Sequence, residues 1–557
     1  MPVNNHPGNT TVERDLPTLQ KLDDEITCDV VIIGGGPNGL MTAAYLAKAG
    51  LEVVLLERRY EVGGGLATEE ILFPSYFANT HATYHLMVDY MPALSDFNLA
   101  GHSLQFVKPN RQTGIIFKDG TSLYMSAKIQ DTADQLMKFS REDAVTFEKY
   151  SRKFIKIIDE ILAPATYYKP IPPVEMAVKQ ERTEIGKELM SFFEDSPLEI
   201  IERLFKDDRI RTLFLYVICM WGLGPKEAGL GYLVPLLLMR TGMNKCISIG
   251  GSHKLASSLA KEIVINKGLI LENAEVTKIL MENGRAVGVE VFDGQIVKAK
   301  TIVSSLDPQT TFLNLVGEEH LPPNLASYAK RWEWDKTSFF TTHIATKEPV
   351  RYKTDEQEIN SAFMNIVGVD STDEFVQMMD DIRTGKIDTI AGHCSVETLY
   401  DRTLSQVPGH HTAFFQMLVP AQIEGGWEEK KDEVAAKVME KWGNYAENLN
   451  GGNVVMTTSE SPLDIERRIP CMKNGSIKHG EYNPLQMGYF RPNDLCSRTN
   501  TPIEGLYVCG ASTYPGGLIL GGPGYIAANK IAEDMDVKKW WKYSDRIERY
   551  AKEYIED

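Results

Sequence analysis

The stretch from Asp29 to Gly64 constrains the fold of this chain more than any other segment. It predicts an apolar strand, a glycine turn, a helix and a second apolar strand that ends at an acidic residue. Gly34, Gly36 and Gly39 form a G-x-G-x-x-G turn. The first glycine permits the tight turn, the second lets a pyrophosphate approach the backbone, and the third lets helix and strand pack closely. This context favours a Rossmann-type dinucleotide site over a glycine-rich turn without a ligand.

Glu57 lies 18 residues after Gly39, at the end of the second predicted strand. Its carboxylate can accept both ribose hydroxyls of an adenosine, and its charge would repel a 2′-phosphate, which argues against NADP. A second glycine pair, Gly63 and Gly64, follows six residues later. Glycines there let the chain pass close to a bound dinucleotide.

Two further segments extend the predicted site. Residues 505–535 contain a short apolar strand, a glycine-rich loop and a helix that begins near Gly524. A helix N-terminus beside a flavin stabilises the negative charge of the reduced ring. In the middle of the chain, Asn283-Gly284 and Asp293-Gly294 separate alternating apolar runs, which predicts a three-stranded meander returning to a strand at Thr301–Ser304.

Together these segments, from "VVIIGGGPNGL" to "CGASTYPGG", resemble the FAD family that contains glutathione reductase, amine oxidases and phytoene desaturases. The resemblance is strongest to the phytoene desaturase-like branch, and within it to the proteins named for a pyridine nucleotide-disulphide oxidoreductase domain. It implies that FAD is bound by Gly34, Gly36, Pro37, Asn38, Gly39, Glu57, Arg58, Gly63, Gly64, Gly65, Leu66, Ala67, Val276, Ser305, Gly510, Ala511, Gly521, Gly522 and Tyr525. Many members have arginine at the position of Gly65, so one expected contact is missing.

We expect an α/β fold: a Rossmann-type FAD-binding domain of the glutathione reductase and amine oxidase kind, with a second, discontinuous α+β substrate domain. The predicted FAD domain collects residues 26–100, 245–310 and 455–535, and the substrate domain collects residues 101–244 and 311–454. Residues 1–25 are expected to form a flexible tail and residues 536–557 a C-terminal helix. A chain of 557 residues exceeds one core, which also predicts two domains.

Composition limits which partners the protein is expected to bind and in which compartment it is expected to occur. The formal net charge of −17 disfavours nucleic acid. The seven cysteines contain no C-x-x-C, which excludes a disulphide-reductase mechanism and predicts reduced thiols in a cytoplasmic protein. No metal-ligand cluster is visible. The apolar segment 213–239 favours a buried helix pair, with the wall of a substrate tunnel or a peripheral membrane contact as the alternatives.

A flavin restricts the reaction to electron or hydride transfer. The resemblance implies an FAD-dependent dehydrogenase, or desaturase, that introduces a C=C bond into an apolar terpenoid, carotenoid-like or alicyclic substrate. The electron acceptor would be oxygen, a quinone or a redox protein, and a homo-oligomer is left open. Candidate catalytic residues are His81 and His85 as bases, Tyr514 as a donor to substrate or flavin, and Arg491 as a contact to flavin or a polar substrate end.

Three other functions stay open. A flavin-dependent saturase or double-bond isomerase would need reduced flavin. An amine oxidase is disfavoured because Ala511 stands where such enzymes usually carry glutamate. A non-catalytic flavin-binding interaction protein would fit the departures at Gly65 and Tyr514.

Overall fold

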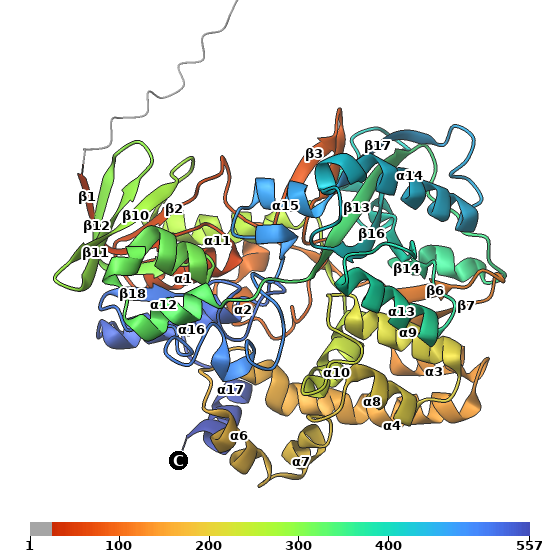
Figure 1. Ribbon diagram of the computed structural model, residues 1–557, viewed down its shortest axis with the longest axis horizontal. Helices are drawn as coiled ribbons and strands as arrows, with labels where there is room; N and C mark the ends of the chain where they lie inside the picture. The colour runs from red at the N-terminus through yellow and green to blue at the C-terminus, as the bar shows by residue number, and fades with distance from the viewer. Residues whose placement is uncertain (1–24, 557) are drawn as a thin grey trace, which may run out of the picture.

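Two seven-stranded sheets, with helices packed around them, organise the protein. The computed structural model describes residues 25–556, so the tail predicted over residues 1–25 lies outside the described residues except for Glu25. Figure 1 shows the first sheet on one side of the molecule, the second sheet on the other, and a layer of helices below the second.

The first sheet has the strand order β10-β11-β12-β1-β2-β9, and β18 also pairs with β12. Val30 and Ile32 of β1 pack into one hydrophobic core, whereas Val31 and Ile33 pack into another. Both faces of this strand are therefore buried, which explains why its sequence is continuously apolar. The strands are β1 (Glu25–Ile33), β2 (Val53–Leu56), β9 (Leu269–Leu271), β10 (Val276–Glu282), β11 (Arg285–Val291), β12 (Ile296–Ser304) and β18 (Leu506–Val508).

The central strands of this sheet are parallel, and the predicted strand, turn and helix form in the expected order. Helix α1 (Pro37–Lys48) connects β1 to β2 and packs against α11 (His253–Ile265) and α16 (Gly522–Asp534). Strand β12 pairs parallel to β1 and antiparallel to β11. The predicted meander therefore forms as β10, β11 and β12, and Asn283 and Gly284 take the positive φ angles of 50° and 83° that its first turn needs.

The second sheet has the order β17-β13-β16-β15-β14-β6-β7. Most of its neighbours are antiparallel, and β14 pairs parallel to β6. The predicted domain boundary at residue 455 falls inside β17, which pairs with β13 and so belongs to this sheet. The strands are β6 (Arg111–Ile116), β7 (Ser122–Ser126), β13 (Thr337–Thr346), β14 (Met364–Val367), β15 (Gly392–Ser395), β16 (His411–Pro420) and β17 (Val454–Glu460).

Helices between residues 127 and 246 form the layer under the second sheet. Ser140 caps α4 by accepting a hydrogen bond from the Asp143 N–H, as its sequence predicts. Helix α9 is buried along its length from Ile210, apart from the half-buried Arg211. The helices are α3 (Ile129–Met137), α4 (Arg141–Ile157), α5 (Ala163–Ala165), α6 (Pro173–Gln180), α7 (Glu184–Met190), α8 (Pro197–Leu204), α9 (Asp208–Cys219) and α10 (Val234–Leu236).

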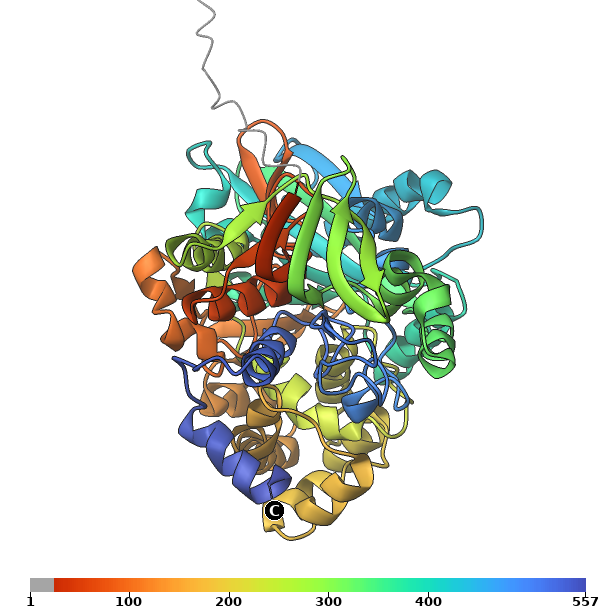
Figure 2. The ribbon, with the colours of Figure 1, turned by 90° about the vertical axis from the view of Figure 1, so that its left-hand side faces the viewer.

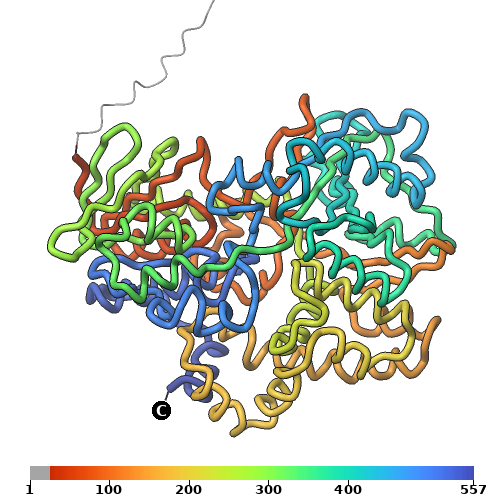
Figure 3. The backbone as a smooth tube through the Cα atoms, in the orientation of Figure 1, coloured from red at the N-terminus to blue at the C-terminus, as the bar shows by residue number. Residues whose placement is uncertain are grey.

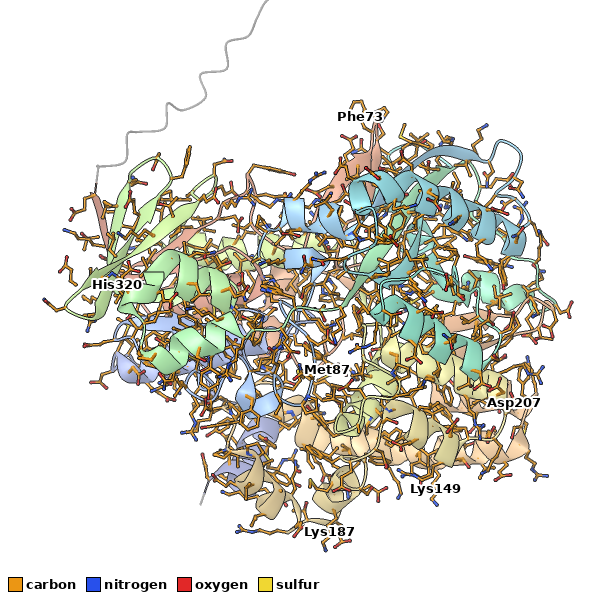
Figure 4. All side chains as sticks on the ribbon, viewed as in Figure 1. Phe73, Met87, Lys149, Lys187, Asp207 and His320 are labelled. Atoms are coloured by element: carbon orange, nitrogen blue, oxygen red, sulfur yellow. The ribbon has the colours of Figure 1, made fainter. Side chains whose placement is uncertain are left out.

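The remaining helices cover the edges and the junction of the two sheets. They are α2 (Pro92–Asp96), α12 (Pro323–Lys330), α13 (Thr372–Arg383), α14 (Trp427–Tyr445), α15 (Pro462–Arg468) and α17 (Asp545–Tyr550). Figure 3 traces how the chain passes from the first sheet to the second and back twice. A hairpin of β3 (Thr68–Leu72) and β4 (Tyr76–Asn79) projects from the molecule, with the exposed Phe73 at its tip (Figure 4).

The C-terminal segment differs from the predicted helix over residues 536–557. Helical structure begins only at Asp545 and runs to Ile555, with its last turn wider than an α-helix. Asp536, just after the end of α16, has a φ of +52°. The chain beyond it packs two tryptophans against the hydrophobic core that contains α1. The Trp540 ring stacks on Tyr45, and the Trp541 side chain is buried beside it. Figure 2 shows this segment below the first sheet.

Candidate functional site

The glycine turn after β1 has the geometry that its sequence predicts. Gly34 has a φ of +93°, which L side chains rarely adopt. A Cβ on Gly39 would lie 2.1 Å from the Gly34 carbonyl oxygen, so only glycine lets α1 approach the strand. A Cβ on Gly36 would meet no atom within 4 Å, because this residue borders a cavity. Gly64, a member of the second glycine pair, has a φ of +54° and lies against Gly36.

Glu57 marks one end of this cavity. Its carboxylate accepts hydrogen bonds from the Gly35 N–H at 2.7 Å and the Arg59 N–H at 2.8 Å, and only 8% of the residue is exposed. Burial raises the pKa of Glu57, while the two backbone donors act in the opposite direction. Each carboxylate oxygen has a second lone pair, so the group can still accept ribose hydroxyls. The adjacent wall is formed by residues 274–276.

The C-terminal glycine segment closes the cavity against the first turn. The Ser305 hydroxyl donates to the carbonyls of Ile33 and Gly34 at 2.9 and 3.1 Å. A Cβ on Gly510 would lie 2.3 Å from the Ser305 carbonyl oxygen, so glycine is needed where the last strand meets this turn. Ala511 and residues 517–519 then line the cavity. The segment before α16 therefore reaches the same cavity as the N-terminal motif, from the opposite end of the chain.

Many of the residues predicted to bind FAD line this one cavity, which we call the cofactor cavity. They are Gly34, Gly36, Pro37, Asn38, Glu57, Arg58, Gly64, Gly65, Val276, Ser305 and Ala511. The Asn38 side-chain oxygen is buried without a hydrogen-bond partner among the described residues. An acidic end, a glycine turn free of side chains and an unpaired polar atom together fit a dinucleotide. Contact with FAD itself stays a prediction for each residue.

The other predicted cofactor residues do not line the cavity but support it or lie elsewhere. They are Gly39, Gly63, Leu66, Ala67, Gly510, Gly521, Gly522 and Tyr525. Gly63 donates from its N–H to the Gly35 carbonyl at 2.8 Å and so holds the second glycine pair on the first turn. A Cβ on Gly522 would clash with the Thr166 carbonyl oxygen at 2.2 Å. The Tyr525 ring packs edge-on against Tyr45, away from the cavity.

Of the two candidate histidines, only His81 lines the cofactor cavity. Its Nε2 is buried and has no hydrogen-bond partner among the described residues. Burial lowers the pKa of His81 to about 4, and the nearby Arg468 contributes in the same direction, so the ring is neutral at pH 7. His85 points elsewhere: its backbone pairs with Cys246, and its Nε2 lies 3.4 Å from the Ser248 hydroxyl. His85 does not line this cavity, and its role as a base stays a prediction.

Arg491 also lies outside the cavity. Its guanidinium is fully buried and donates to the carbonyls of Lys478, Gln486 and Ala511 at 2.7 to 3.1 Å. These bonds to backbone carbonyls tie the 478–491 loop to the C-terminal glycine segment, and a contact of Arg491 with flavin or a polar substrate end stays a prediction. The predicted donor Tyr514 lines a second cavity, and its hydroxyl donates to the Ala165 carbonyl at 2.8 Å.

The second cavity, which we call the apolar cavity, measures about 500 Å³. Helices α5, α6 and α7, the 221–237 segment and the 482–490 loop form its walls. None of the described residues that line it carries a charge at neutral pH. Trp221, Gly517 and Leu518 line both this cavity and the cofactor cavity, so the two adjoin. Lys187, at the lower edge of the molecule in Figure 4, shows where α7 lies.

The apolar segment 213–239 therefore has two roles. Residues 213–219 belong to the buried helix α9, as the favoured interpretation predicts. The later part, including Leu230, Leu233 and Leu236, forms the wall of the apolar cavity, as the alternative interpretation predicts. No helix of the described residues is long and apolar enough to cross a membrane.

Several cavity residues escaped prediction from the sequence. Arg468 ends α15, and its guanidinium lies 3.1 Å from Glu69 and pairs with Glu460. The loop after it, residues 469–472, covers the cofactor cavity between the two sheets, where Figure 1 shows α15. His479 and Gln416 complete the walls. Gln416 could have been noticed as a polar residue inside the apolar strand run "HTAFFQMLVP".

Among residues 25–556, no group of three or more histidine, cysteine or acidic side chains is placed to hold a metal ion. All seven cysteines are free thiols. Burial raises the pKa of Cys509 and Cys496 to about 12, and Cys471, which lines the cofactor cavity, is shifted in the same direction. These thiols therefore stay protonated at neutral pH.

Comparison with known proteins agrees with this geometry. A sequence model described as flavin containing amine oxidoreductase matches residues 38–381. One of the subunits of limonene dehydrogenase from Castellaniella defragrans is 37% identical over 536 residues, which cover 93% of this chain and 97% of that protein. Pyridine nucleotide-disulfide oxidoreductase domain-containing protein 2 of Rattus norvegicus is 26% identical, covering 91% and 94%. A solved oxidoreductase from Methanosarcina mazei has the same fold, with a TM-score of 0.57 at 18% identity, covering 91% of this chain and 100% of its own.

Proposed function

This chain belongs to the flavin-containing amine oxidoreductase family, and we propose that it is a dehydrogenase that introduces a C=C bond into an apolar terpenoid. FAD supplies the hydride acceptor, its N5 atom, when bound. The observation that carries the proposal is the apolar cavity, which has no charged lining residue and adjoins the cofactor cavity at Trp221, Gly517 and Leu518. The relative named as part of limonene dehydrogenase supports a terpene as the substrate class.

The lining of the apolar cavity argues against amine oxidation. A substrate ammonium taken out of water needs a carboxylate or several acceptors to offset its desolvation. The described lining of this cavity offers no carboxylate. A hydrocarbon skeleton requires neither, and a volume of about 500 Å³ falls in the usual range for small-molecule sites.

We assign the remaining chemical roles to His81 and Tyr514. His81 lines the cofactor cavity and is neutral at pH 7, so its ring can accept the proton that desaturation releases. Tyr514 would pack against the substrate with its hydroxyl already bonded to Ala165, which makes it a shape-determining contact rather than a proton donor.

We further propose that the mouth of the apolar cavity rests on a membrane, from which an apolar substrate enters. Val174 and Phe193, which line the cavity, are 79% and 43% exposed, and the neighbouring Leu485 is 81% exposed. Such a rim fits a peripheral contact by apolar side chains. The electron acceptor would be oxygen, a quinone or a redox protein, and a homo-oligomeric state stays a prediction.

Anaerobic titration of the flavin-loaded protein with apolar terpenoids tests the proposed function. We expect one compound class to bleach the visible flavin band, and matched amines to leave it unchanged. Conversion of a compound only after chemical reduction of the flavin would support a saturase, or an isomerase if the hydrogen count of the product is unchanged. Failure of every donor to bleach the flavin would support a non-catalytic flavin-binding protein.

A further inference from the structure

A row of polar side chains crosses the second sheet where this sheet covers the cofactor cavity. Thr341 of β13, Gln416 of β16 and His393 of β15 are directly opposite one another in adjacent strands. Residues paired in this way point to the same face of a sheet. Gln416 lines the cofactor cavity, so the face that carries this row is the face turned toward it.

Hydrogen bonds fix the Gln416 amide in one orientation. Its Nε2 donates to the Thr341 hydroxyl at 2.9 Å, and its Oε1 lies 3.1 Å from His393 Nε2. His393 Nδ1 lies 3.1 Å from the Tyr216 hydroxyl. Thr341, His393 and Tyr216 are each at most 3% exposed, and Gln416 is 8% exposed. The row is therefore a continuous buried network that ends at a cavity wall.

The protonation state of His393 completes the network. Burial lowers the pKa of His393 to about 3, so its ring is neutral and carries a single N–H. That hydrogen belongs on Nε2, facing the Gln416 oxygen, while Nδ1 accepts from the Tyr216 hydroxyl. A glutamine amide has two N–H groups, and Thr341 accepts only one. The second N–H of Gln416 has no acceptor among the described residues.

The position of Gln416 identifies what this N–H faces. Glu57 and the glycine turn occupy the end of the cavity that suits the adenosine and the phosphates. Trp221, which borders both cavities, contacts Phe339, and Phe339 contacts His393. The polar row thus lies at the opposite end, where the cofactor cavity adjoins the apolar cavity. A dinucleotide with its adenosine at Glu57 places its other end there.

We propose that Gln416 is a cofactor-contacting residue whose free amide N–H donates to the flavin ring, with Thr341 and His393 as positioning residues. Reduction adds negative charge to the ring, and a hydrogen bond to a charged acceptor is stronger than one to a neutral acceptor. The donor therefore stabilises the reduced ring more than the oxidised ring and raises the midpoint potential of the bound flavin. The inference rests on FAD binding and not on the identity of the substrate.

The midpoint potential of the bound flavin, measured with a chemical reductant and a reference dye, tests this proposal without any substrate. In Gln416→Leu we expect flavin content close to the parent protein and a reduction equilibrium at least about tenfold less favourable, which equals about 30 mV for a two-electron couple. His393→Phe leaves the amide present but unfixed, so a smaller shift in the same direction is expected. Gln416→Met serves as a second, similarly shaped variant if the leucine variant folds poorly.

Thr341→Val and Thr342→Val form the matched control pair. Both threonines are buried in β13, but Thr342 faces the other side of the sheet and bonds Ser459 at 2.9 Å. We expect a lowered potential in Thr341→Val and an unchanged one in Thr342→Val. A potential that stays within about a twofold change in the reduction equilibrium in flavin-loaded Gln416→Leu and Gln416→Met would overturn the proposal.

Discussion

At the scale of single residues, two glycines of the G-x-G-x-x-G turn have different purposes: one is needed for folding, and the other keeps the cavity wall free of a side chain. Gly39 is required by the fold, because a Cβ there would overlap the Gly34 carbonyl at 2.1 Å. Gly36 is not, because a Cβ there would enter open space at the wall of the cofactor cavity. Its backbone is also in a region open to any residue, with a φ of −68°.

Substitution at these two positions should therefore give different results. In Gly36→Ala we expect the unfolding free energy of the flavin-free protein to change by no more than about 0.5 kcal/mol, as at a site without contacts. The Kd for FAD should rise at least about tenfold, because the methyl group occupies space next to the helix N-terminus where phosphates bind. Gly39→Ala should instead destabilise the flavin-free protein by about 1–3 kcal/mol. Urea unfolding and flavin titration measure the two effects, and equal destabilisation by both substitutions would contradict this division.

Glu397 provides a pH prediction at the same scale. Burial raises its pKa to about 8, although the Asn79 amide donates to it at 2.8 Å. Because the folded pKa lies above the unfolded value, this residue favours folding most at low pH, and that contribution is lost as the pH rises toward 8. Glu397→Gln should remove this dependence and stabilise the protein above pH 8 by up to about 5 kcal/mol, because a shift of one pKa unit corresponds to about 1.4 kcal/mol.

Urea unfolding at several pH values between 5 and 9 checks this expectation, with the exposed Glu440→Gln as the control. The two unfolding profiles should diverge as the pH rises. A Glu397→Gln variant whose pH profile matches that of the parent protein would show that Glu397 ionises normally in the folded state.

At the scale of elements, α15 connects the second sheet to the cofactor cavity. It follows β17 directly, carries Arg468 at its end, and leads into residues 469–472 over the cavity. Its N-terminus is held by a capping box between Ser461 and Asp464. Helix α8 has the same arrangement between Ser196 and Glu199 but does not reach the cofactor cavity.

These two capping boxes allow a matched test of α15. Ser461→Ala and Ser196→Ala should each lower the unfolding free energy by about 1 kcal/mol. Only Ser461→Ala should also speed the release of FAD, because it loosens the helix that positions the covering loop. Stopped-flow release of flavin distinguishes the variants, and identical release rates would mean that α15 does not hold this loop.

The sequence predicts the first sheet better than the second for a physical reason. Glycine turns, the Asn283-Gly284 hairpin and continuously apolar strands are local signals, so β1, α1, β2 and the meander follow from them. The hydrogen bonds of Arg491 and His85 were not foreseen, because their partners, the backbone carbonyls and Cys246, are brought near only by tertiary folding. The sequence suggested no role for Arg468 or Gln416, because their place at the cavity emerges only when the two sheets meet.

At the scale of the whole molecule, the proposed function depends on two adjoining cavities. The first sheet and the glycine segments line the cofactor cavity, the helical layer encloses the apolar cavity, and Trp221, Gly517 and Leu518 form their common boundary. The family resemblance is confirmed by the match over residues 38–381. The discontinuous division into an FAD domain and a substrate domain stays a prediction, with its boundary at residue 455 moved beyond β17.

The account also predicts the effect of filling the apolar cavity. Leu236 lines the apolar cavity but does not line the cofactor cavity. Leu236→Trp should therefore leave flavin content and potential unchanged while weakening the binding of an apolar substrate at least about tenfold. Substrate titration followed by the visible flavin spectrum measures this, and wild-type affinity in this variant would place the substrate elsewhere.

The most direct measurement of the central claim is the hydrogen count of the product after one anaerobic turnover. The flavin-loaded protein is mixed with the terpenoid that bleaches it, and the product is analysed by mass spectrometry against the amount of flavin reduced. We expect a product lighter by two hydrogens, formed in a one-to-one ratio with reduced flavin and suppressed in Leu236→Trp. A product with an unchanged or increased hydrogen count, or bleaching without any altered terpenoid, would contradict the claim that this protein desaturates an apolar substrate.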